Sequence, residues 1–108
     1  MTGPADLERR YAWTTAEQMR LHRAWLVKEV AGGAMSIDAL FDEGAAGGRT
    51  GTVKVVVLAQ SVPGVGKVRA RRAMGELGIS EEARWGEVDA TMLRSLWAAM
   101  ADAATRPI

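Results

Sequence analysis

The residues with the clearest chemical potential form one glycine-rich turn and the start of the segment that follows it. Pro63 fixes φ where the chain bends, and Gly64 and Gly66 permit backbone conformations that a Cβ would forbid. Val65, between these glycines, is expected to point into the core as an anchor. Such a turn leaves the backbone amides up to Lys67 pointing outward at a helix N-terminus, which is a ready binding site for a phosphate group.

Four basic residues follow this turn closely, within the first two turns of the expected helix: Lys67, Arg69, Arg71 and Arg72. The helix dipole disfavours cations near an N-terminus by about 0.3–1 kcal/mol each, and a bound polyanion would reverse the sign of that penalty. With Ala70 facing inward, Arg69 and Arg71 project from opposite flanks and Arg72 points outward. This arrangement suits two phosphate strands better than a single small anion.

The net charge of +1 hides an uneven distribution of charge along the chain. Six basic residues and no acidic one lie between Gly44 and Gly75, so the rest of the chain carries a net charge of −5. Lys54 and Arg84 are candidates for outer phosphate contacts. A single basic patch can bind a polyanion, although a charge cluster on its own is more often a solvated face.

Other kinds of functional site find little support. Without cysteine there is no disulfide framework, zinc ribbon or thiol chemistry, and the lone His22 provides neither a metal cluster nor a Ser-His-Asp system. Ser61 and Val68 replace two residues that a Walker P-loop needs, and Arg69 replaces the third glycine of a dinucleotide motif. We therefore predict no catalytic residue, no cofactor and no metal site.

The longest apolar run, residues 55–59, is too short to span a membrane, and no leader is visible, so we expect a cytoplasmic protein.

The elements that must position the turn are predicted to be helices. Thr15 and Gln18 match the ends of a capping box, so a helix is expected over residues 15–31, where two glycines stop it. Residues 1–14 are expected to form an N-terminal arm, either loose or with a further helical turn or two.

The middle of the chain suggests a division into two units. Ser36 is expected to cap a short helix over residues 37–43. Residues 44–51 contain four glycines and predict a flexible loop. We therefore expect one unit over residues 15–51 and a second over residues 52–104.

The second unit is predicted to be helical throughout. The β-branched residues of 53–59 favour a strand, but no second strand-like run is available to pair with it. We therefore expect a short buried helix with Thr52 as its cap, then a helix over residues 66–77 and a last helix capped by Asp89. The core-facing residues of the last two helices follow i, i+3, i+4, i+7 spacing: Ala70, Ala73, Met74 and Leu77, then Leu93, Leu96, Trp97 and Met100. The result is an all-α fold of five to six helices.

The Pro-Gly-Val-Gly turn, with Ala70 four residues after it, resembles a helix-hairpin-helix or helix-two-turns-helix module. The longer string 63–71, with Met74 and residues 77–80 behind it, is similar to the actinobacterial integration host factors over about residues 23–100. This resemblance implies a long N-terminal helix packed on an S13-like helix-two-turns-helix domain. It also implies a nucleoid-associated protein that binds duplex DNA with little sequence preference, bends or compacts it, and assists phage site-specific recombination.

One segment departs from the family that the chain resembles. After Ile79 and Ser80 that family usually carries an Arg-Arg-x-Arg-Gly run associated with DNA binding. Here residues 82–86 keep only Arg84, and Glu81 and the acidic residues that follow it add negative charge.

These features predict a non-enzymatic protein that binds duplex DNA with little sequence preference, since the chain has no Asn and only two Gln for reading bases. The predicted DNA-binding residues are Lys54, Pro63, Gly64, Val65, Gly66, Lys67, Arg69, Arg71, Arg72 and Arg84. The expected partners are double-stranded DNA and, through the resemblance, a phage-type integrase, with the chain monomeric in the absence of DNA. Two alternatives stay open: a module that docks on a recombinase through Leu21 and Trp25, and an RNA-binding module.

Overall fold

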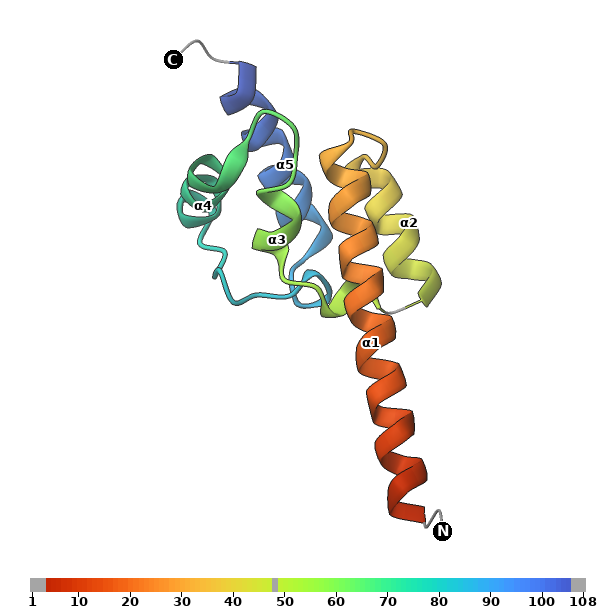
Figure 1. The fold of residues 1–108 in the computed structure, drawn as a ribbon. Coiled ribbons are helices and arrows are strands. Elements are labelled where there is room, and N and C mark those ends of the chain that lie inside the picture. Colours follow the sequence, from red (N-terminus) through yellow and green to blue (C-terminus); the bar gives the residue numbers. More distant parts are fainter. Residues whose placement is uncertain (1–3, 48, 106–108) are drawn as a thin grey trace.

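The computed structural model describes residues 4–47 and 49–105, with side chains described for 15–43 and 49–102. These residues form five α-helices and two 3-10 helices, and they contain no β-strand, so the predicted all-α class is confirmed. In chain order the elements are α1 (Pro4–Ala31), α2 (Ile37–Gly47), η1 (Thr50–Thr52), α3 (Val55–Ala59), α4 (Gly66–Leu77), η2 (Trp85–Glu87) and α5 (Ala90–Thr105). The first part of α1 projects beyond the other helices (Figure 1).

The first helix is longer than the sequence analysis predicted. It begins at Pro4, so the expected start at Thr15 is wrong and the N-terminal arm is largely a continuation of α1. Proline is well suited to the first turn of a helix, and no glycine or further proline interrupts the chain before the helix ends at Ala31. The predicted stop is confirmed, because the chain turns at Gly33 with a φ of 75°.

The second helix also exceeds its predicted length. Its start is as expected, since the amide of Ala39 donates to Ser36 Oγ at 3.3 Å. The helix continues past Glu43 to Gly47, so the expected loop from residue 44 onward is wrong for its first half. Ala45 and Ala46, between the first two glycines, have high helix propensity, which the prediction from the number of glycines did not take into account.

The ambiguous valine run forms a helix, but its first residues pair with another part of the chain. Val53 and Lys54 are extended, and Lys54 forms an isolated antiparallel bridge with Arg84. The amide of Val55 donates to the carbonyl of Ala83 at 3.0 Å. Thr52 is not the cap of α3, because its hydroxyl donates to a carbonyl within its own turn at 2.7 Å.

One hydrophobic core joins all five α-helices. The predicted inner faces of α4 and α5 are confirmed, with Leu77 and Trp97 half-buried at the edge of the core and the other six residues buried. Trp85 of η2 is 4% exposed and lies between Phe41 and Trp97, with ring centroids 5.5 and 5.4 Å away. The last helix is capped as predicted, since the amide of Thr91 donates to Asp89 Oδ1 at 3.0 Å.

Candidate nucleic-acid interface

The turn between α3 and α4 has the backbone that its sequence predicted. Gly64 and Gly66 have φ values of 80° and 73°, in the left-handed region that favours glycine. Val65 is 6% exposed and packs in the core, so its role as an anchor is confirmed. A Cβ placed on Gly66 would meet no atom within 4 Å outside its two neighbouring residues and the nearby backbone of its own helix, so open space faces this side of the bend.

The N-terminus of α4 carries no stabilising side chain. Its N-cap is Val65, which makes no side-chain capping bond, and the first turn holds no acidic residue. The first amides of a helix have no intrahelical acceptor, and together with the dipole they attract an anion. The amide of Val65 donates to the carbonyl of Val62 at 3.1 Å. Because the end of the helix is exposed and uncapped, a phosphate oxygen can approach the amides from Gly66 onward.

The four cations of α4 differ in their partners. Arg69 is half-buried, and its Nη1 donates to the carbonyl of Gly64 at 2.9 Å. This bond stabilises the turn that precedes α4. Arg71 Nε lies 2.9 Å from Glu81 Oε1. Lys67 and Arg72 are exposed and have no ion-pair partner within the described part of the chain. Two of the four cations are therefore free to bind an external anion.

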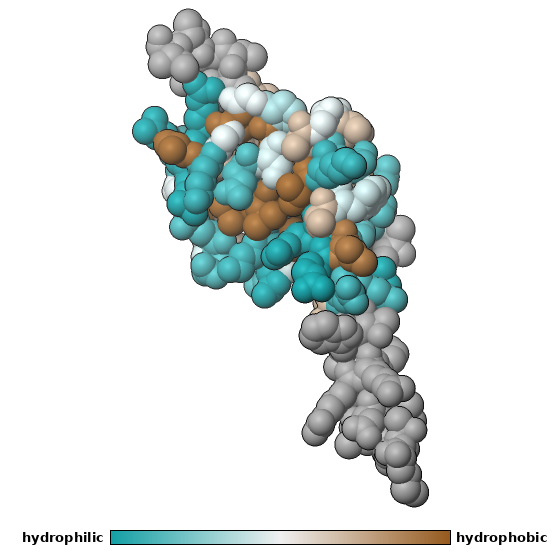
Figure 2. Space-filling model, viewed as in Figure 1, coloured by the Kyte–Doolittle hydropathy of each residue, from teal (hydrophilic) through white to brown (hydrophobic). Residues whose placement is uncertain are grey.

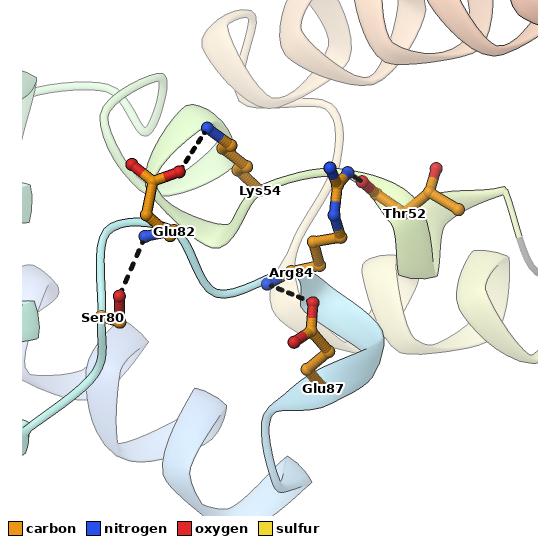
Figure 3. Close-up of polar contacts among 6 residues, drawn as sticks. All are labelled: Thr52, Lys54, Ser80, Glu82, Arg84 and Glu87. Carbon is orange, nitrogen blue, oxygen red and sulfur yellow. Dashed lines mark hydrogen bonds and ion pairs between the residues drawn. The ribbon is translucent and has the colours of Figure 1, made fainter.

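The two outer candidates, Lys54 and Arg84, lie at the bridge between the start of α3 and η2 (Figure 3). Lys54 Nζ lies 2.8 Å from Glu82 Oε2, and the hydrogen bond and charge of Lys54 lower the pKa of that carboxyl. Arg84 donates through Nη1 to the carbonyl of Thr52, and its own amide donates to Glu87 Oε1 at 3.3 Å. Both cations thus hold internal acceptors while remaining partly open to solvent.

The same two cations line a groove of about 500 Å³ between α1 and α3. Two arginines of α1 that sequence reasoning missed, Arg20 and Arg23, complete a set of four cations around it. The other lining residues are Met19, Thr52, Val53 and Val57. Figure 2 shows hydrophobic residues gathered over α3 on this face, with hydrophilic residues bordering them. The i, i+3 spacing of the two arginines on a helix was the available signal, but only the packing of α1 against α3 places them beside Lys54.

The structure therefore sorts the predicted residues into two groups. The turn group comprises Pro63, Gly64, Val65, Gly66, Lys67, Arg69, Arg71 and Arg72, and the groove group comprises Lys54 and Arg84. Within the described residues, no hydrogen bond or ion pair joins one group to the other. The loop from Ser80 to Ala83 supplies a carboxylate to each group.

Among the described residues, no group of three or more His, Cys, Asp and Glu side chains could hold a metal ion. His22 is used structurally, because its Nε2 lies 2.9 Å from the hydroxyl of buried Thr50 and its ring lies 5.7 Å from that of Trp25. No helix in the described ranges is long and apolar enough to cross a bilayer.

The outer face of α1 carries a small apolar stripe. Leu26 and Val30 face the core, whereas Leu21 and Trp25 are 62% and 43% exposed. Met19 is 39% exposed at the edge of the groove. Leu21 and Trp25 are therefore accessible for the protein contact that the alternative prediction assigns to them.

Comparisons with known proteins match this architecture. Residues 30–94 match the family model of the S13-like H2TH domain, so the body of the molecule is a helix-two-turns-helix unit that contains the turn and α4. An integration host factor of Streptomyces coelicolor is 34% identical over 89 residues, which cover 82% of this chain and 83% of that protein. A structure of sIHF bound to an 8 bp palindromic DNA matches with a TM-score of 0.72 and 32% identity, covering 81% of this chain and 98% of that one. The chain belongs to the actinobacterial integration host factor family.

Proposed function

We propose that this chain binds duplex DNA through its turn group, with little dependence on base sequence. The observation that carries the proposal is the uncapped, exposed N-terminus of α4. It is closely followed by two cations, Lys67 and Arg72, that have no ion-pair partner among the described residues. An uncapped helix N-terminus and cations close to it both destabilise the free protein, and a bound phosphate chain offsets both costs. The DNA in the structure of the related sIHF supports the same partner.

In this proposal each member of the turn group has a distinct role. The amides near Gly66 donate to one phosphate, and Lys67 and Arg72 contact its neighbours on the two strands. Arg69 keeps the turn in shape through its bond to the carbonyl of Gly64. Recognition stays independent of sequence because these are contacts to the sugar-phosphate backbone, which carry no base information directly.

The groove group serves as a further contact for the same duplex. Lys54 and Arg84, with Arg20 and Arg23 from α1, give a second cationic surface on the body of the molecule. A duplex that curves around the body would touch both groups, and in this way the protein would bend or compact DNA as a nucleoid-associated protein.

A salt titration tests the main proposal. If about four phosphates are neutralised, affinity for duplex DNA should fall about 10²-fold between about 50 and 200 mM salt. The double variant Lys67→Gln with Arg72→Gln should lower the slope of log affinity against log salt by about 1.8. Arg94→Gln, which removes one positive charge, is the control, because Arg94 pairs with Asp38 on α2 at 2.8 Å and its substitution should leave the slope unchanged. An affinity that does not depend on salt contradicts the proposal.

The exposed Leu21 and Trp25 favour a second candidate, a contact with a protein such as a recombinase. Charge reversal at Lys67 and Arg72 should abolish DNA binding but leave a complex centred on Trp25 intact. Competition between duplex DNA and RNA in the same assay separates the proposed function from RNA binding.

A further inference from the structure

The loop between α4 and η2 places two adjacent carboxylates on two of the predicted DNA-binding cations. Glu81 Oε1 lies 2.9 Å from Arg71 Nε of the turn group, and Glu82 Oε2 lies 2.8 Å from Lys54 Nζ of the groove group. These distances are those at which a phosphate oxygen would bind the same nitrogens. Each carboxylate therefore occupies the position that a DNA phosphate would take.

The loop is held in place at both ends, so these contacts do not depend on chance encounters of flexible side chains. Ile79 is 8% exposed and packs in the core at the start of the loop. The hydroxyl of Ser80 accepts from the amide of Glu82 at 3.1 Å (Figure 3). Its carbonyl accepts from the amide of Ala83 at 3.0 Å, so Ser80 closes the turn twice. After Ala83, the bridge to the start of α3 fixes the chain again.

Neither ion pair is placed where it could contribute much to folding. The side chains of Arg71 and Glu81 are 49% and 52% exposed, and those of Lys54 and Glu82 are 40% and 80% exposed. Ion pairs open to solvent contribute little to stability. Their effect on an approaching polyanion is larger, because each pair must open and leave an unpaired negative charge beside the DNA.

We propose that Glu81 and Glu82 act as internal competitors of DNA phosphate and set the affinity of this chain for duplex DNA. This inference rests on the function proposed above. In the free protein the carboxylates occupy Arg71 and Lys54, and DNA must displace them. Lys54 lowers the pKa of Glu82, so this competitor keeps its charge at neutral and mildly acidic pH.

Neutralising the two carboxylates tests this inference. Each of Glu81→Gln and Glu82→Gln should tighten binding to duplex DNA about threefold, and the double variant about tenfold, at about 50 mM salt. The gain should shrink towards about 200 mM salt, because salt screens the repulsion. The matched control is the double variant Asp42→Asn with Glu43→Gln, which removes the same charge from α2 and should change affinity less than twofold. Thermal unfolding of every variant confirms that the fold is retained.

A double-mutant cycle distinguishes competition from a general charge effect. Arg71→Gln should weaken DNA binding more in the Glu81→Gln background than in the otherwise unchanged protein, because only there is Arg71 free in advance. Equal losses in both backgrounds, or double-variant binding no tighter than that of the control, would overturn the inference while leaving DNA binding itself intact. If neither the unchanged protein nor the double variant binds duplex DNA at low salt, both the inference and the proposed function are wrong.

Discussion

Replacing Gly66 by alanine should separate the role of the turn in DNA binding from its role in stability. Gly66 and Gly78 both have a φ of 73°, and Gly78 is the first residue after α4. A Cβ on either glycine would meet no atom within 4 Å outside the neighbouring residues and the nearby helix backbone. The cost of Gly66→Ala and of Gly78→Ala is therefore conformational rather than steric. An L-residue in this region costs about 1–2 kcal/mol, so both variants should lose about that much stability.

The two variants should differ in DNA binding. Only Gly66 lies beside the amides that we propose to donate to a phosphate, and relieving the strain there rotates those amides away. A hydrogen bond to a charged group contributes about 1.5–3 kcal/mol, so the loss of one should weaken binding by about tenfold or more. Gly78→Ala lies at the other end of the helix and should leave affinity within about twofold of the unchanged protein.

Two measurements on the same preparations check this prediction. Urea unfolding should give similar free energies for both variants, and a gel shift at about 50 mM salt should show weak binding for Gly66→Ala alone. If Gly66→Ala binds duplex DNA as tightly as Gly78→Ala, the amides of the turn do not hold a phosphate, and the reasoning from the uncapped helix is refuted.

Four further predictions concern the body of the molecule. Gly86→Ala should destabilise the fold by about 1–2 kcal/mol in urea unfolding, since its Cβ would lie 3.2 Å from two backbone atoms of η1. Gly75→Ala, whose Cβ would have open space on α4, should instead stabilise the fold by about 0.5–1 kcal/mol. Trp85→Ala should cost about 3–5 kcal/mol in the same assay, because it leaves a cavity between two aromatic rings. Lys54 holds the pKa of Glu82 below its ordinary 4.5, so the small contribution of this exposed ion pair to stability is present above that pH and is lost as the pH falls through the lowered pKa. Any difference in Tm between the unchanged protein and Glu82→Gln should disappear as the pH falls from about 7 to about 3.

The turn and the helices around it could be predicted because their signals are local. Pro63 and the two glycines specify a bend within four residues, and the helix that follows shows its buried face through the spacing of Ala70 and Met74. The cap at Asp89 is likewise read from adjacent residues. None of these features depends on how the chain packs elsewhere.

The predictions that failed depended on weighing competing local signals. A capping box at Thr15 is a sound helix start, but nothing upstream ends a helix already begun at Pro4. At Val53 the strand propensity of valine is partly expressed, because the extended backbone there pairs with residues 83–85 before α3 begins. Only tertiary structure shows that this partner segment is available.

The composition of the candidate site could be predicted only in part, for the same reason. The cations of α4 are adjacent in sequence, whereas Arg20 and Arg23 approach Lys54 only because α1 packs against α3. The pairing of Glu81 with Arg71 likewise follows from the return of the chain after Gly78. Sequence showed an excess of negative charge in this loop, but only the structure shows which cations it opposes.

The start of α4 differs from the starts of α2 and α5 in a way that favours an external partner. The first amides of α2 are met by Ser36, with acidic Asp38 in the first turn, and those of α5 are met by Asp89. The chain thus uses ordinary side-chain capping at α2 and α5. At α4 it places a valine at the cap and Lys67 in the first turn, which leaves the dipole uncompensated. The short helix α3 also lacks a capping side chain, but the amide of Val55 at its start donates to the carbonyl of Ala83. At the exposed start of α4, a phosphate chain would supply the missing negative charge.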